Sequence, residues 1–274
     1  MKRPAFITLI VALLTACSFG ANVTANEPLS NVYRSAAHDA EATHLDNVTD
    51  VRKRHKADLE TEIYRLCGTL QDGSTPPNCT LPTIDAAAND ERDSAKVLAD
   101  AMHTIEADIN NVPHESVIIL ARHYAELATL ALTSPELPKE AELTTPHDVE
   151  RLRAGIDHEY ANAYALEVAA ARDNAGTEAK LEETVEQHRK NAQDLSKLVQ
   201  DGVPAPAPGY VIDDPIADPT GFAAALEQDS VAFWLAETSA AETDAWRLIC
   251  LRAAAAAALR ATMFNPNTEY LHNS

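Results

Sequence analysis

The feature that most constrains the fold is a run of four helical segments in the C-terminal half, joined by a short, a long and a short connection. Apolar residues at three- and four-residue spacing predict helices over about 145–174, 178–201, 218–238 and 242–264. Residues 203–217 hold four prolines, so they must form an extended connection instead of a helix. The sequence therefore predicts an all-α protein whose residues 144–264 form a four-helix bundle with a long crossover, as in ferritin-like bundles.

The N-terminal half also reads as helices. No stretch alternates apolar and polar residues for long enough to indicate a strand, and 46% hydrophobic with 23% charged residues is typical of a globular protein. Three helices are predicted within an N-terminal region at 29–133, and they cover about 30–70, 84–110 and 114–132. A linker at 134–143 separates this region from the bundle, and residues 265–274 are predicted to be a frayed tail.

The first residues indicate export and a lipid anchor. Lys2 and Arg3 precede an apolar run of nine residues from Phe6 to Leu14, which is too short to cross a bilayer and fits a cleavable signal peptide at 1–16. The ending LTAC, at residues 14–17, resembles the lipobox of bacterial lipoproteins, in which the cysteine corresponding to Cys17 is lipidated. The alternative is an ordinary signal peptide with an incidental cysteine.

The acidic net charge limits which partners the chain could bind by electrostatic attraction. A formal net charge of −20 would be repelled by nucleic-acid phosphates, so no nucleic-acid partner is expected. The same charge would not attract an anionic lipid surface, whereas a two-chain lipid on Cys17 would give stable attachment. We expect a tether at 17–28 that holds the protein on the extracytoplasmic face of the cell membrane.

Three further cysteines follow. Cys67 and Cys79 flank a turn-rich segment, and an exported chain meets conditions that permit disulfides. A Cys67–Cys79 disulfide is therefore predicted. Cys250 lies inside an apolar helical run, where it is expected to be a small buried residue.

Polar residues interrupt the predicted apolar seams of the bundle. Glu159 lies within the seam of the helix at 145–174, and His188 lies within the seam of the helix at 178–201. Glu227 faces inward in the third helix if Asp229 does not. A buried carboxylate requires a partner, so these side chains are expected to meet inside the bundle.

Two interpretations of this polar set remain open. The first is a buried ion pair, with Arg189 or Arg247 reaching in from the edge. The second is a degenerate divalent-metal site built from the seam residues Glu159, His188 and Glu227. A di-iron site of ferritin-like bundles needs Glu-x-x-His on two helices. Here Val185 stands three residues before His188, and the fourth helix has no histidine.

Histidines also cluster in the N-terminal half. His38, Glu41 and His44 follow each other at three-residue intervals, and Glu41 to His44 formally matches Glu-x-x-His. Four more histidines occur at positions 55, 103, 114 and 123. These residues are expected to be surface histidines, with a divalent-metal site as the alternative.

The C-terminal segments resemble a known family. The matching segments are IDHEYANAYAL at 156–166, EQHR at 186–189, GVP at 202–204, YVIDDP at 210–215 and AALE at 224–227. They resemble the ferritin-like domain of unknown function found in actinobacterial exported proteins and lipoproteins, over about residues 145–264. The resemblance implies a ferritin-like bundle and no particular activity.

These observations predict a lipid-anchored envelope protein that acts as a binding or interaction module and not as an enzyme, with an envelope protein or a small ligand as its partner. No cofactor is expected. The alternatives are a metal-binding ferritin-like protein, and a structural spacer at the membrane surface with no pocket between its two parts.

Overall fold

The computed structural model describes residues 23–42, 46–84, 92–173, 176–212 and 217–272, and the regular structure within these ranges is entirely helical. The α-helices are α1 (Glu27–Ala40), α2 (Asp46–Cys67), α3 (Ser94–Asp108), α4 (Val117–Ala131), α5 (Pro146–Ala170), α6 (Glu178–Ser196), α7 (Pro219–Ala240) and α8 (Asp244–Phe264). Two short 3-10 helices, η1 (His114–Ser116) and η2 (Glu269–Leu271), complete the set. The predicted all-α class is confirmed.

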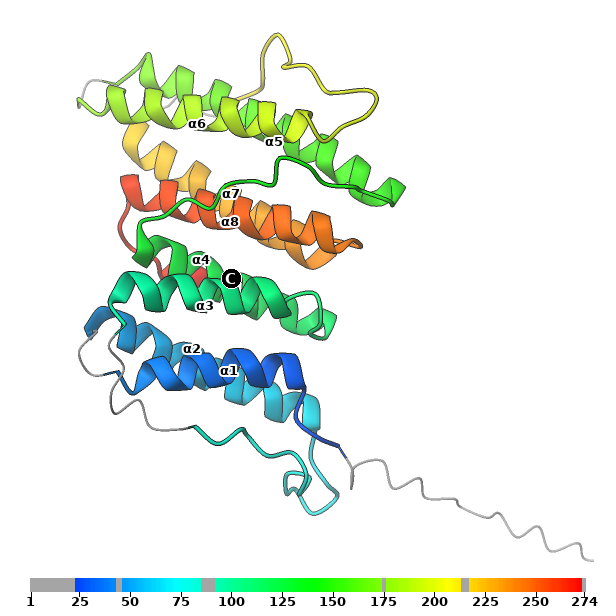
Figure 1. The fold of residues 1–274 in the computed structure, drawn as a ribbon. Coiled ribbons are helices and arrows are strands. Elements are labelled where there is room, and N and C mark those ends of the chain that lie inside the picture. The colour runs from blue at the N-terminus through cyan, green and yellow to red at the C-terminus, as the bar shows by residue number, and fades with distance from the viewer. Residues whose placement is uncertain (1–22, 43–45, 85–91, 174–175, 213–216, 273–274) are drawn as a thin grey trace, which may run out of the picture.

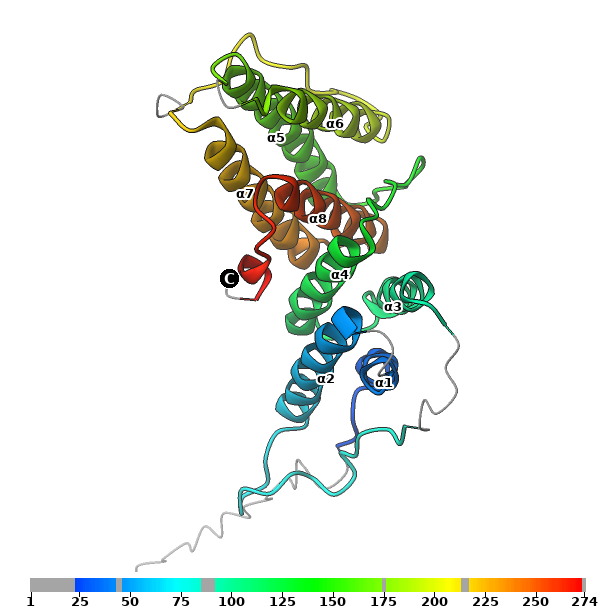
Figure 2. The ribbon, with the colours of Figure 1, turned by 90° about the vertical axis from the view of Figure 1, so that its left-hand side faces the viewer.

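The helices pack as four pairs, which are stacked one upon the next (Figure 1). The α1–α2 pair forms one end of the stack, and the α3–α4, α7–α8 and α5–α6 pairs follow in that order. The side view in Figure 2 shows the same order. The last two pairs therefore lie in the reverse of their order along the chain.

Two helix starts in the C-terminal half follow directly from the sequence. Thr145 and Asp218 are the N-caps of α5 and α7, and a proline begins each helix. The hydroxyl of Thr145 accepts a hydrogen bond from the Asp148 amide at 3.2 Å, and the Asp218 carboxylate accepts one from the Gly221 amide at 3.0 Å. These side chains satisfy amides that have no partner within the helix.

Within its described residues the N-terminal region has four α-helices, so the predicted count of three is wrong. The segment expected as one helix over 30–70 divides into α1 and α2. At the end of α1, the Glu41 amide turns back to the carbonyl of His38. At the start of α2, the Thr49 hydroxyl donates to the carbonyl of Ala42 at 2.6 Å. These local bonds end one helix and tie the next one to it.

One buried apolar core runs through both halves of the chain. It includes Leu29 of α1 and Leu127 of α4 together with Ile156 of α5 and the two tryptophans, Trp234 and Trp246. Helix α4 packs directly on α7 and α8. The extended segment between α4 and α5, which includes the predicted linker at 134–143, therefore connects two parts that share a core.

The described C-terminal residues, which end at His272, fold back onto the body, so over these residues the tail is not frayed as predicted. Leu271 in η2 is only 1% exposed, and η2 packs against α4. His272 approaches Glu126 with a nitrogen–oxygen distance of 3.4 Å. An apolar anchor and a contact between an imidazole and a carboxylate hold this segment.

Some of the remaining predictions, on the N-terminus and the cysteines, fall on described residues and others do not. The predicted signal peptide at 1–16 and the lipidated Cys17 lie outside the described residues, and the predicted tether overlaps the start of α1. The structure joins Cys67 and Cys79 by a disulfide with an S–S distance of 1.98 Å. Cys250 is a buried free thiol. Within the described part of the chain, no helix is both long and apolar enough to cross a membrane.

Candidate functional site

Four charged side chains, one from each of α5 to α8, meet inside the C-terminal half. They are Glu159, His188, Glu227 and Arg260, and each is at most 4% exposed. Each lies near the middle or the last turns of its helix and points toward the other helices. The competing residue Asp229 is exposed, so the predicted alternative to Glu227 is wrong.

The imidazole of His188 lies between the two carboxylates. Its Nδ1 is 2.7 Å from Oε2 of Glu159, and its Nε2 is 2.7 Å from Oε1 of Glu227. Carboxylates accept hydrogen bonds, so we assign a proton to each ring nitrogen and a positive charge to the ring. Arg260 then donates from Nε to Oε2 of Glu227 at 2.9 Å.

Two neutral donors complete the hydrogen bonding of the Glu159 carboxylate. Trp234 of α7 donates from its indole nitrogen to Oε1 at 3.0 Å. Asn191 of α6 donates from Nδ2 to Oε2 at 3.3 Å. The acceptors of Glu159 are therefore engaged by three side chains from two helices, as a buried carboxylate requires.

The charges stabilise one another against the cost of burial. Burial alone would raise the pKa of Glu159, but the charge and the hydrogen bond of His188 lower this pKa to about 2. Burial also opposes the charge on His188, and the carboxylates, Glu227 foremost, raise the pKa of the imidazole above its ordinary value. Burial would raise the pKa of Glu227, and Arg260 and His188 lower it. Two positive and two negative charges therefore form a neutral network.

This geometry does not fit a shared metal ion. Two ligands at 2.0–2.2 Å from one metal lie about 3 Å or more apart. Each nitrogen of His188 instead lies 2.7 Å from a carboxylate oxygen, which is a hydrogen-bond distance. The adjacent Arg260 would also repel a cation. The arrangement can hold charge inside the bundle and fix the register of four helices.

The predicted arginine partners are wrong. Arg189 pairs with Glu186 and Glu167 at the surface. Arg247 donates to the Asn110 side chain and the carbonyl of Ala241. The arginine that enters the network is Arg260, which follows the alanine-rich run of α8.

A second buried polar set lies between α2 and α4. His55 is fully buried, donates from Nε2 to Glu126 at 2.9 Å, and stacks on His123 with ring centroids 3.8 Å apart. His123 donates from Nε2 to Asp58 at 3.1 Å. Burial and the neighbouring His123 lower the pKa of His55 well below its usual value, so His55 is neutral. The expectation of surface histidines is wrong for these two.

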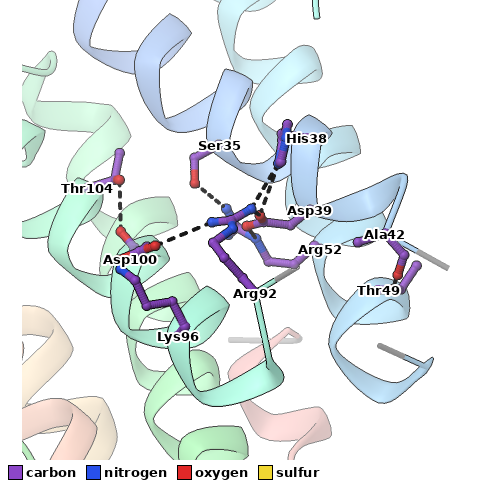
Figure 3. A network of polar contacts seen from close by, with 10 residues as sticks. All are labelled: Ser35, His38, Asp39, Ala42, Thr49, Arg52, Arg92, Lys96, Asp100 and Thr104. Carbon is purple, nitrogen blue, oxygen red and sulfur yellow. Dashed lines mark hydrogen bonds and ion pairs between the residues drawn. The ribbon is translucent and has the colours of Figure 1, made fainter. Parts of the chain in front are cut away.

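This set continues into a network between α1, α2 and the segment before α3 (Figure 3). The buried carboxylate of Asp39 accepts from Nε of Arg52 and from Nη2 of Arg92, each at 2.9 Å. Arg92 also approaches His38 at 2.9 Å and Asp100 at 3.4 Å. Of the predicted cluster, His38 therefore belongs to this ion network, Glu41 is an exposed residue at the end of α1, and His44 lies outside the described residues.

A third cluster joins the start of α5 to the start of α8. Ligand atoms of His147, Asp148 and Glu242 lie within 4.8 Å of one another. However, the Asp148 carboxylate already accepts from the amides of Glu242 and Thr243 at 3.1 and 2.8 Å, and from the Thr243 hydroxyl at 2.6 Å. Asp148 thus serves to hold the two helix starts together.

The fold and the site define a class of helical protein with a neutral ionic network buried among its four C-terminal helices, and a sequence comparison finds a family match over the same helices. Residues 152–271 match a family described as a domain of unknown function (DUF4439). This match includes all four network residues and the folded-back tail. No curated protein matches the chain. No solved structure matches it either.

Proposed function

We propose that this chain is a lipid-anchored cell-envelope protein whose helical body, with a ferritin-like arrangement of α5 to α8, acts as a binding or interaction module and not as an enzyme. The observation that carries the proposal is the closed state of the buried network. Both nitrogens of His188 and both carboxylates are engaged with each other, so the network has no free base, nucleophile or open ligand position.

An enzyme site needs groups that can reach a substrate. Glu159, His188 and Glu227 are each at most 1% exposed and bond within the protein. A general acid or base must lie within hydrogen-bonding reach of the reacting group. The two carboxylates and the imidazole satisfy that requirement only for one another, which favours a structural role for these three groups and leaves recognition to other parts of the molecule.

Metal analysis tests this proposal against its main alternative. The full chain is saturated separately with iron, manganese and zinc, and the bound metal is measured after gel filtration. We expect sub-stoichiometric metal, and no change in His188→Ala. Stoichiometric metal that is lost in His188→Ala, and kept in the surface control His103→Ala, would overturn the proposal in favour of a metal-binding protein.

The envelope location has a separate test. Membrane fractionation and intact mass of the expressed protein should show a membrane-bound form that carries a diacylglyceryl group on Cys17. Cys17→Ser should release the chain from the membrane fraction. Retention of Cys17→Ser in that fraction would contradict the anchor.

A further inference from the structure

A cleft opens beside the buried network, on the side of α6 and α8. It has a volume of about 300 Å³, at the lower end for small-molecule sites. Its walls come from α6, from α8 and from the segment after α4, which includes Pro135 and Leu137. The extended segment thus closes a space that α6 and α8 leave between them.

Arg260 connects this cleft to the network. Its side chain lines the cleft, although it is only 4% exposed. Nε of Arg260 donates to Glu227, whereas the buried Nη2 has no hydrogen-bond partner among the described residues. A guanidinium has five N–H donors, and leaving a buried donor unpaired costs free energy. Because Arg260 lines the cleft, an acceptor bound there would satisfy the unpaired Nη2 donor.

The other lining groups restrict what this acceptor can be. Leu259 and Met263 of α8 join Pro135 and Leu137 in an apolar wall. Asp194 also lines the cleft, and its two oxygens are occupied by Lys190 at 2.7 Å and Lys197 at 2.6 Å. Glu136 is a second acid in the lining, and the two acids together disfavour a doubly charged phosphate more than a singly charged carboxylate. A planar carboxylate with an apolar body matches both the guanidinium and the wall.

We infer that the cleft between α6, α8 and residues 134–137 binds a small monocarboxylate with an apolar body, and that Arg260 holds the carboxylate. The inference rests on the proposed function as a binding module and names the class of its ligand. Glu227 would then fix the guanidinium from one side while the ligand accepts from the other. The neutral network positions Arg260, and the alkyl part of the ligand covers the apolar wall.

The test is calorimetric titration of the full chain with 4-methylpentanoate near neutral pH, with 4-methylpentanamide as the uncharged probe of the same shape. We expect saturable one-to-one binding of the acid, and at least about tenfold weaker binding of the amide, a difference of about 1.4 kcal/mol. Equal binding of acid and amide, or no saturable binding of the acid, would overturn the inference.

Two variants locate the site. Arg260→Gln removes the charge that holds the carboxylate. Met263→Trp fills the cleft without altering the network, so this second variant keeps the test decisive if Arg260→Gln does not fold. Each should weaken binding of the acid about tenfold or more, whereas the surface control Arg189→Gln should bind like the wild type. Wild-type affinity in Met263→Trp would also refute the inference. If this titration fails and the purified protein holds no metal, the proposed function still stands, since that function is contradicted by metal bound through His188 or by membrane retention of Cys17→Ser.

Discussion

The charge of Glu159 should make a measurable, pH-dependent contribution to stability. In the folded protein the pKa of this carboxyl is lowered from 4.5 to about 2. A lowered pKa means that the ionised form is stabilised by folding, so the contribution is complete above pH 4.5 and is lost as the pH falls toward 2. The shift corresponds to about 3 kcal/mol.

The substitution Glu159→Gln keeps the shape of the side chain and removes its charge. At neutral pH the variant should unfold with about 3 kcal/mol less free energy than the wild type, because His188 and Arg260 lose a buried counter-charge. As the pH falls below 4.5, the wild type loses the same contribution by protonation. The difference between the two proteins should therefore shrink toward zero near pH 2.

The assay is urea unfolding followed by far-ultraviolet circular dichroism, repeated at several pH values from neutral to acid. Comparison with Glu167→Gln supplies the control, because Glu167 pairs with Arg189 at the surface, and exposed ion pairs contribute at most about 1 kcal/mol. A cost of less than about 1 kcal/mol at neutral pH, or a cost that does not change with pH, would show that Glu159 is not a stabilising buried charge.

Three further predictions concern the body of the protein. His188→Leu should lower the free energy of unfolding by about 3–5 kcal/mol, since two buried carboxylates lose their shared partner; a loss under 1 kcal/mol in urea titration would contradict the network. Gly155→Ala should destabilise by roughly 1–2 kcal/mol in the same assay, despite the better helix propensity of alanine, because its Cβ would lie 2.6 Å from Trp234. An unchanged midpoint would argue against that contact. The double variant Cys67→Ser/Cys79→Ser should lose roughly 3 kcal/mol of the free energy of unfolding, because the unfolded chain is no longer constrained by a closed loop. Thermal unfolding of the wild type with and without reductant measures the same effect, and an unchanged midpoint would contradict the prediction.

Part of the site could be predicted because its neighbours mark the helix face. Glu159 and His188 lie in seams whose other members, such as Leu152 and Leu195, are apolar and buried. The periodicity therefore identified them as inward-facing residues. Arg260 follows a run of alanines in α8, where every face carries the same small residue. Alternation between apolar and polar residues is absent in that run, so no periodic pattern indicated that Arg260 points inward.

The N-terminal polar residues show a second reason why burial could not be predicted from the sequence. The charged stretch at 52–56 reads as a solvated face, yet Arg52 and His55 are fully buried. Their partners are Asp39 of α1 and Glu126 of α4. Compensation by an acid 71 positions away in the chain is a tertiary effect, and local pattern alone cannot reveal it.

The order of the helix pairs has a consequence for how the chain folds when it is made. The α7–α8 pair, which is the last to be synthesised, occupies the space between α3–α4 and α5–α6 (Figure 1). The earlier pairs cannot close on one another until this last pair enters between them, so the apolar faces of α4 and α5 stay uncovered until the whole chain has emerged. Such late, long-range closure is slow and exposes the chain to aggregation.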